Sequence, residues 1–241
     1  MGINNMGDKL LEKRRERRKK RIENVRNLRE TQWLIICEGE KTEPNYFKGL
    51  VAELNLKGIN KIDIKTCGEG TSTKSLVKRV DRYFEYCDKV SGATKIPYAK
   101  IILIFDQDGF GAEKFNTAIQ MAKQRYPTSI VAWSNESFEL WLCLHFEYEQ
   151  SPLHRNNYND KLTAIFRSNG EFTNRQNYEK HGKNLDNIFK SITKCGGSYK
   201  TAIRNARKLA AGKDLHNPAK CNPTTMVFEA VDVLIAESEE S

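Results

Sequence analysis

The sequence predicts an α/β fold, with a parallel four-stranded sheet flanked by helices and a helical C-terminal region. Four strand-like segments are separated by stretches of helical periodicity. This alternation is typical of repeated βαβ units, whose connections are long enough for right-handed crossovers. Helices then cover both faces of the sheet. The expected strands span 33–37, 61–67, 100–105 and 129–133.

Apolar content identifies the strands, and helix-start and helix-stop residues identify the helices between them. Residues 33–37 form an unbroken apolar run, and so do the residues of 100–105 after Lys100, as expected of strands buried on both faces. The segment 61–67 instead alternates apolar and polar residues. Pro44 suits the first turn of a helix, and Pro127 ends one. The expected helices span 43–54, 75–87, 112–126 and 136–146.

Beyond about residue 150 the sequence predicts polar helices and no strand. The segment NPTT at 222–225 resembles a helix start, with a capping residue before an apolar-periodic run. We therefore expect three parts: a basic arm at 1–30, an α/β domain at 31–150 and a helical region at 151–241. The helical region is either a subdomain or a set of layers packed over the sheet.

Positive charge is concentrated at the N-terminus. Residues 1–30 hold eleven Lys and Arg against five Asp and Glu, a net of +6, so the remaining chain carries +3 of the total +9. The block KRRERRKKR at 13–21 fits contact with the phosphate backbone of a nucleic acid. The alternative is a solvated helix or a disordered tail that aids solubility.

The sequence argues against a membrane protein, a secreted protein and a structural zinc site. Every apolar run is far shorter than the roughly 18 residues that a membrane span needs. The N-terminus lacks the apolar region of a secretory signal, so we expect a cytoplasmic protein. The six cysteines include no CxxC pair, which favours free thiols over structural zinc.

Carboxylates follow two of the expected strands. Glu38 comes directly after 33–37, and Asp106 and Asp108 come after 100–105. Side chains at i and i+2 of an extended segment point the same way, so the two aspartates project together. If the strands are neighbours, Glu38 faces them, and three close carboxylates repel unless a cation neutralises them. Oxygen ligands favour Mg²⁺ or Mn²⁺. The alternative is an ordinary Asp-Gln-Asp-Gly turn.

Several motifs together resemble the RloB family (AbiLii-like proteins), over about residues 30–237. The resemblance implies a Toprim-type fold, related to the nuclease domains of OLD-type proteins, primases and topoisomerases. It also implies Mg²⁺-dependent phosphodiester chemistry on DNA or RNA, and a role beside an AAA-type ATPase in bacterial phage defence. The motifs are LIICEGEKTEPNYF, ILIFDQD, SNESFELWLCLHF and NPTTMVFEAV.

The resemblance assigns roles to the strand-end carboxylates. Glu38 matches the Toprim glutamate, and Asp106 and Asp108 match the DxD motif, with a neutral Gln107 where relatives often carry a basic or variable residue. The aspartates would hold one or two Mg²⁺ ions, which polarise the scissile phosphate. Glu38 would act as general base or as a further metal ligand.

Two further groups are candidate substrate contacts. Lys41 is close enough in sequence to bind a phosphate or to bridge Glu38 and Glu43, while Glu43 favours the positive end of the helix that it begins. The loop after the second strand has the glycines and hydroxyls of a phosphate cradle without P-loop spacing, and its alternative role is helix capping. The candidates in this loop are Thr71, Ser72 and Lys74.

Glu139 is unusual because it lies in a helix that is apolar on nearly every face. A buried carboxylate must be paired, protonated or metal-bound. Glu139 therefore either joins the metal site as a fourth acidic group or forms a salt bridge to a buried Arg or Lys. His145, six residues later, does not share its face and is expected to be a packed or capping histidine.

The leading hypothesis is therefore a metal-dependent nuclease. The second is a catalytically idle nucleic-acid-binding or sensor module for the ATPase. A nucleotidyl or phosphoryl transferase is a weaker third hypothesis, because the sequence has no P-loop. A homo-oligomer is left open.

Overall fold

The sheet has five strands, of which the first four are parallel and the fifth is antiparallel. The structure is a computed structural model that describes residues 11–21, 32–56, 62–67, 77–80, 82, 98–107 and 111–239. In spatial order the strands are β2 (Ile62–Thr66), β1 (Trp33–Cys37), β3 (Lys100–Asp106), β4 (Ile130–Asn135) and β5 (Thr224–Thr225). The central strands β1 and β3 are direct neighbours, with Cys37 in register with Ile104.

The α/β class is confirmed, but the expectation of a purely parallel sheet of four strands is wrong. Thr224 and Thr225 form β5 and pair antiparallel with Asn135 and Ser134 of β4. The expectation of no strand beyond residue 150 fails for the same reason. A two-residue strand is too short to show the alternation by which strands are recognised.

The helices agree closely with the sequence prediction where the structure describes them. The helix expected at 136–146 is shorter, and residues 77–80 and 82 of the one expected at 75–87 are helical while its remainder lies outside the described residues. The longer elements are α2 (Thr42–Glu53), α4 (Ala112–Arg125), α5 (Phe138–Cys143), α6 (Arg155–Ser168), α7 (Ile188–Lys194), α8 (Tyr199–Ala210) and α9 (Val227–Glu239). Two short 3₁₀ turns are η1 (Gly182–Asn184) and η2 (Pro218–Lys220).

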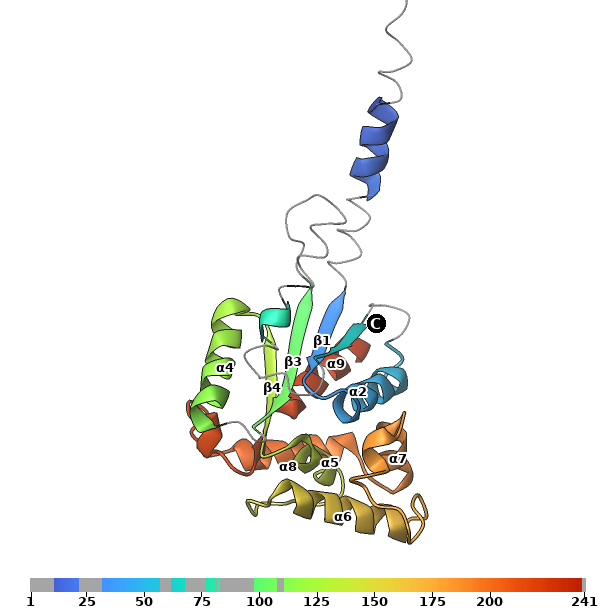
Figure 1. The fold of residues 1–241 in the computed structure, drawn as a ribbon, viewed down its shortest axis with the longest axis vertical. Coiled ribbons are helices and arrows are strands. Elements are labelled where there is room, and N and C mark those ends of the chain that lie inside the picture. The colour runs from blue at the N-terminus through green and yellow to red at the C-terminus, as the bar shows by residue number, and fades with distance from the viewer. Residues whose placement is uncertain are drawn as a thin grey trace, which may run out of the picture.

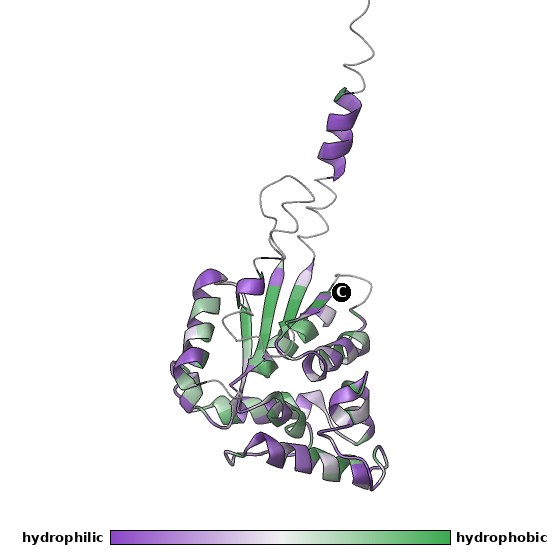
Figure 2. Cartoon of the chain, viewed as in Figure 1, coloured by the Kyte–Doolittle hydropathy of each residue, from purple (hydrophilic) through white to green (hydrophobic). Residues whose placement is uncertain are grey.

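Helices cover both faces of the sheet, and a separate apolar core lies on each face (Figure 1). Successive β1 side chains alternate between these cores, Ile35 toward the α2, α5 and α9 side and Leu34 and Ile36 toward α4. All three are fully buried. This two-sided burial explains the unbroken apolar runs, which stand out as green strands in Figure 2.

The C-terminal helices bring sequence-distant residues over the carboxyl ends of the strands. α7 packs against α2, α6 against α5, and α9 against β4 and α8. The segment between α6 and α7, which includes η1, therefore lies beside the start of α2. This placement completes one wall of the pocket described below.

The basic arm is helical over residues 11–21, and each of these residues is exposed. β1 begins at Trp33, so the chain enters the sheet at the end opposite to the carboxyl ends of the strands.

Among the described residues, no helix has the length and apolar character to cross a membrane. The five cysteines in this part of the chain are buried free thiols, and Cys87 lies outside it.

Candidate functional site

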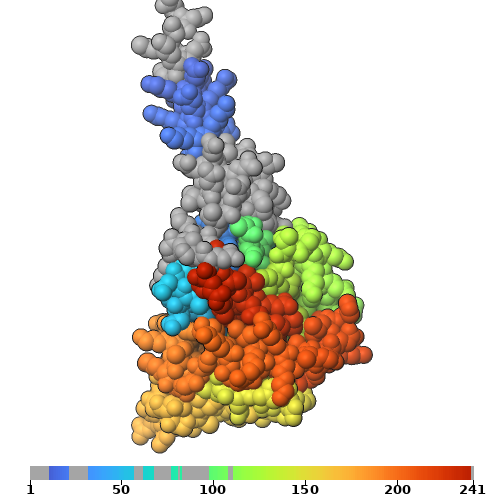
Figure 3. All heavy atoms as spheres, turned by 180° about the vertical axis from the view of Figure 1, so that it is seen from behind, coloured from blue at the N-terminus to red at the C-terminus, as the bar shows by residue number. Residues whose placement is uncertain are grey.

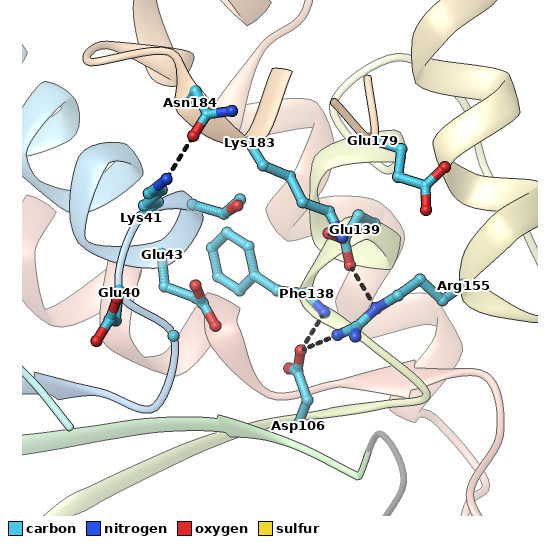
Figure 4. Close-up of a pocket in the computed structure, with 12 residues that line it drawn as sticks. Glu40, Lys41, Glu43, Asp106, Phe138, Glu139, Arg155, Glu179, Lys183 and Asn184 are labelled. Atoms are coloured by element: carbon cyan, nitrogen blue, oxygen red, sulfur yellow. Dashed lines mark hydrogen bonds and ion pairs between the residues drawn. The ribbon is translucent and has the colours of Figure 1, made fainter. Parts of the chain in front are cut away.

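A pocket of about 380 Å³ opens at the carboxyl ends of β1 and β3. Its walls come from the turn between β1 and α2, the end of β3, the first turns of α5 and α6, and the segment before and within η1. The carboxylates of Glu43, Asp106 and Glu139 reach it from three different elements (Figure 4). Parallel strands place their carboxyl ends at one edge, which is where ligands bind in such sheets.

Asp106 ends β3 and is 7% exposed. Its Oδ2 accepts a hydrogen bond of 2.9 Å from the backbone N–H of Phe138, at the start of α5, and lies 3.3 Å from Nη2 of Arg155. Its Oδ1 is buried and has no hydrogen-bond partner within the described part of the chain. Burial, with the nearby charge of Glu43, raises the pKa of Asp106 well above its usual value. One oxygen therefore orders the site, while the other is left buried without a partner in the described residues.

Glu139 lines this pocket and is ion-paired, as the salt-bridge alternative from the sequence predicted. It is 3% exposed, and its Oε2 lies 3.3 Å from Nε of Arg155 while its Oε1 lies 3.7 Å from Nζ of Lys183. Both cations line the same pocket. A buried carboxylate needs such partners because desolvation disfavours its charge.

Glu43 is a pocket residue as well as a first-turn residue of α2. It is 7% exposed, and burial together with Glu139 raises its pKa. Its carboxylate lies over Gly39, where a Cβ would overlap it. Gly39 therefore leaves room for this carboxylate. From the sequence, Glu43 was expected to favour the helix start or to be bridged to Glu38 by Lys41.

Glu38 lies at the end of β1, directly beside the residues that line the pocket but not among them. Its Oε2 accepts a hydrogen bond of 3.3 Å from the backbone N–H of Asp106, so the expected approach of the two strand ends is present. Burial is the largest cause that raises the pKa of Glu38 to about 7, and the charge of Glu43 adds to it. Glu38 can therefore exchange a proton near neutral pH.

Of the remaining site residues predicted from the sequence, one lines the pocket and four lie outside the described residues. Lys41 is exposed and lines the pocket, and its Nζ donates to Oδ1 of Asn184 at 2.6 Å, a partner other than the carboxylates proposed for it from the sequence. Four candidates lie outside the described residues: Thr71, Ser72, Lys74 and Asp108.

His145 is a packed histidine, as expected. Its Nδ1 donates to the carbonyl of Trp141 at 2.9 Å, which leaves Nε2 to accept from the Tyr46 hydroxyl at 3.0 Å. Burial lowers the pKa of His145 to about 4. The imidazole is thus neutral and belongs to the core beside α2.

The donors available to a metal at this edge are carboxylate oxygens. Among the described residues, no set of three or more His, Cys, Asp or Glu is arranged to hold a metal ion. Asp108, the third expected ligand, lies outside them. The unpartnered Oδ1 of Asp106 and the protonatable Glu38 beside it nevertheless fit a hard divalent cation, which prefers such ligands.

Sequence reasoning missed two cations of the site, Arg155 and Lys183. Both lie in polar stretches beyond residue 150, where nothing in the local pattern marks them. A carboxylate within an apolar helix, such as Glu139, does predict that a positively charged partner lies nearby. The sequence does not indicate which Arg or Lys is that partner.

The model of a family described as RloB-like protein matches residues 33–234. Because the match spans most of the 241 residues, this chain belongs to the RloB-like family. No curated protein and no solved structure matches the chain.

Proposed function

We propose that this RloB-like protein is a metal-dependent nuclease whose reaction centre is the pocket at the carboxyl ends of β1 and β3. The single observation that carries the proposal is Oδ1 of Asp106, which is buried in the pocket without a partner in the described chain. A buried unpartnered carboxylate oxygen is costly unless a ligand completes it. The proposed fold relationship is to Toprim nuclease domains, in which strand-end carboxylates bind the metal.

Mg²⁺ or Mn²⁺ is the proposed cofactor. Asp106 and Asp108 would hold it, with Glu38 as the adjacent acidic group and Glu139 at the far side of the pocket. When bound, the ion would polarise a phosphodiester for in-line displacement. The oxygen-only donor set supports a cation rather than a neutral ligand here, because a cation would offset the charge of Glu43, which adds to the burial that raises the pKa values of Glu38 and Asp106.

The chain's own residues would perform the remaining tasks. Glu38, with a pKa of about 7, would take a proton from the attacking water. Lys41 would contact a substrate phosphate from the rim, because its Nζ is held by Asn184 at the pocket edge. Arg155 and Lys183 carry positive charge into the same pocket and would offset the charge of the phosphate.

We further propose that the protein acts in phage defence with an AAA-type ATPase. The resemblance of its motifs to RloB proteins supports this partner. Co-purification of the two full chains, with and without ATP, tests it. Failure to associate under either condition would contradict the partnership but not the nuclease.

Cleavage by the full chain tests the nuclease directly. Labelled duplex DNA and single-stranded RNA are incubated with Mg²⁺, Mn²⁺ or EDTA, alone and with the ATPase. We expect metal-dependent cleavage by wild type and its loss in Asp106→Asn and Glu38→Gln. Asp160→Asn is the matched control, because Asp160 is an exposed aspartate on α6. Equal cleavage by wild type and Asp106→Asn in every condition would overturn the proposal.

A catalytically idle nucleic-acid-binding or sensor module is the second candidate. Two observations favour it: Arg155 already lies beside Asp106 and Glu139, and residues 11–21 form an exposed basic helix. On this hypothesis binding is strongly salt-dependent and falls when the charges at 13–21 are removed. Binding would also be the same in Asp106→Asn as in wild type, with no cleavage by either.

A further inference from the structure

A second basic segment lies inside the folded part of the chain. Residues 194–220 contain seven Lys and Arg and one acidic residue, Asp214, a net of +6. This equals the net charge of residues 1–30. The rest of the 241 residues therefore carries a net of −3 against the total of +9. The folded domain is thus not evenly balanced, because one segment of it is strongly basic.

All seven basic side chains of this segment are exposed, and we call them the α8 ridge. Within α8, Lys200, Arg204 and Lys208 recur at intervals of four residues, so they lie on one side of the helix, with successive residues about 6 Å apart along its axis. The opposite side of α8 is buried, and it is apolar except for Asn205. The ridge consists of Lys194, Lys200, Arg204, Arg207, Lys208, Lys213 and Lys220.

Most of this charge has no acidic partner among the residues that the structure describes. Arg207 pairs with Asp232 at 2.7 Å, and Lys194 lies 3.6 Å from Glu171. Lys208 lies 4.0 Å above the ring of Tyr148, a contact that leaves its charge uncompensated. The other four ridge residues have no ion pair within the described part of the chain. Five positive charges therefore face solvent along one helix and its continuation.

The ridge is separate from the pocket. None of its seven residues lines the pocket. α8 packs behind the end of α5, where the Asn205 amide donates to the carbonyl of Leu144 at 2.9 Å, whereas the pocket is lined by Phe138 and Glu139 at the start of α5. Viewed from behind, the orange segment that contains α8 extends across the surface of the molecule (Figure 3).

We propose that the α8 ridge binds the phosphodiester backbone of a nucleic acid. Its linear form, about 12 Å along α8 from Lys200 to Lys208, suits an extended polyanion better than a small anion. An anionic membrane is the less favoured partner, because insertion needs exposed apolar side chains. Leu215 is the single large apolar residue exposed in residues 194–220. The proposal stands whether or not the pocket cleaves nucleic acid.

Binding by the full chain in EDTA tests the ridge apart from any metal chemistry. Lys200→Ala/Arg204→Ala removes two ridge charges and keeps good helix formers in α8. Lys114→Ala/Lys123→Ala is the matched control, with two exposed lysines removed from α4 on the other face of the sheet. Affinity for labelled duplex DNA and single-stranded RNA is measured over a range of salt concentrations. The N-terminal arm is present in every variant.

We expect the ridge variant to bind nucleic acid several-fold more weakly at low salt. Its slope of log affinity against log salt on duplex DNA should fall by about 1.8, or about 0.9 for each lost phosphate contact. Charge reversal by Lys200→Glu/Arg204→Glu should weaken binding further, with thermal unfolding confirming that both variants fold. Equal binding by wild type and the ridge variant, or an equal loss in the α4 control, would overturn the proposal. Binding to anionic phosphatidylserine vesicles is measured for the same variants. A ridge variant that loses binding to these vesicles but binds nucleic acid as wild type does would also overturn the proposal.

Discussion

Arg155 lies between two buried carboxylates of the pocket: its Nη2 is 3.3 Å from Oδ2 of Asp106, and its Nε is 3.3 Å from Oε2 of Glu139. The three residues begin α6, end β3 and lie in the first turn of α5, so one guanidinium joins three elements. A planar, permanently charged group with several donors suits this position better than an ammonium. The pocket therefore depends on this contact for its shape as well as for its charge.

Arg155→Met should destabilise the protein by about 3 kcal/mol at pH 7, because it leaves the buried Asp106 without its cation and Glu139 with Lys183 alone. Urea unfolding at pH 7 and pH 5 measures the loss. At pH 5 the loss should be smaller, since the raised pKa of Asp106 favours a protonated carboxyl that no longer needs a cation. Arg155→Lys is the control, with an intermediate loss expected from a point charge that cannot serve both carboxylates. An Arg155→Met protein as stable as wild type at pH 7 would contradict this account.

The sequence predicted one half of the site much better than the other. Glu38 and Asp106 follow buried strands, and the rule that parallel strands end at one edge brings them together. Arg155 and Lys183 reach the same pocket from the polar helical region, whose placement depends on tertiary packing of α6 and α7. Periodicity identifies helices but does not indicate where they dock. The short strand β5 was not predicted for a related reason: it is defined by its pairing with β4, which is a contact between residues far apart in the sequence.

Gly39→Ala should displace the carboxylate of Glu43, because the added Cβ would overlap it. Because the displaced atoms are the far end of a side chain beside the pocket, the cost should lie near the lower end of the about 1–3 kcal/mol of overpacking, which chemical unfolding at pH 7 would detect. The double variant Gly39→Ala/Glu43→Ala should recover much of this loss, since it removes the atoms that clash. Gly111→Ala is the control, because a Cβ there meets nothing within 4 Å. If Gly39→Ala and Gly111→Ala have equal effects, the close approach of Glu43 is not a constraint.

Glu38 should make the folded state less stable as pH rises. Its pKa is raised from 4.5 to about 7 in the folded protein, so the folded state retains a proton that the unfolded state has lost between these values. The free energy of unfolding should therefore fall across this range, by up to about 1.4 kcal/mol per pH unit for one such group. Glu38→Gln should fall less steeply than wild type in EDTA-treated samples. Parallel pH profiles for the two proteins would show that Glu38 is not the titrating group.

His145 should act in the opposite direction, because its pKa is lowered from 6.5 to about 4 by burial. The unfolded state takes up a proton as pH falls below 6.5 while the folded state does not, so His145 contributes a loss of stability toward about pH 4. Nitrogen chemical shifts should show a neutral ring protonated at Nδ1 at pH 5, as its bond to the Trp141 carbonyl requires.

Removing the Tyr46 hydroxyl tests the hydrogen bond that this hydroxyl donates to Nε2 of His145. Tyr46→Phe keeps the buried ring but leaves Nε2 of His145 without its donor, which should cost about 1–2 kcal/mol in urea unfolding at pH 7. Tyr148→Phe is the matched control, because the half-buried Tyr148 contacts Lys208 through its ring. If both substitutions have the same small effect, or if the nitrogen shifts show a proton on Nε2, then Tyr46 does not fix the tautomer of His145. A larger loss in Tyr46→Phe alone, with the Nδ1–H form seen in wild type, would establish that the core beside α2 holds His145 neutral.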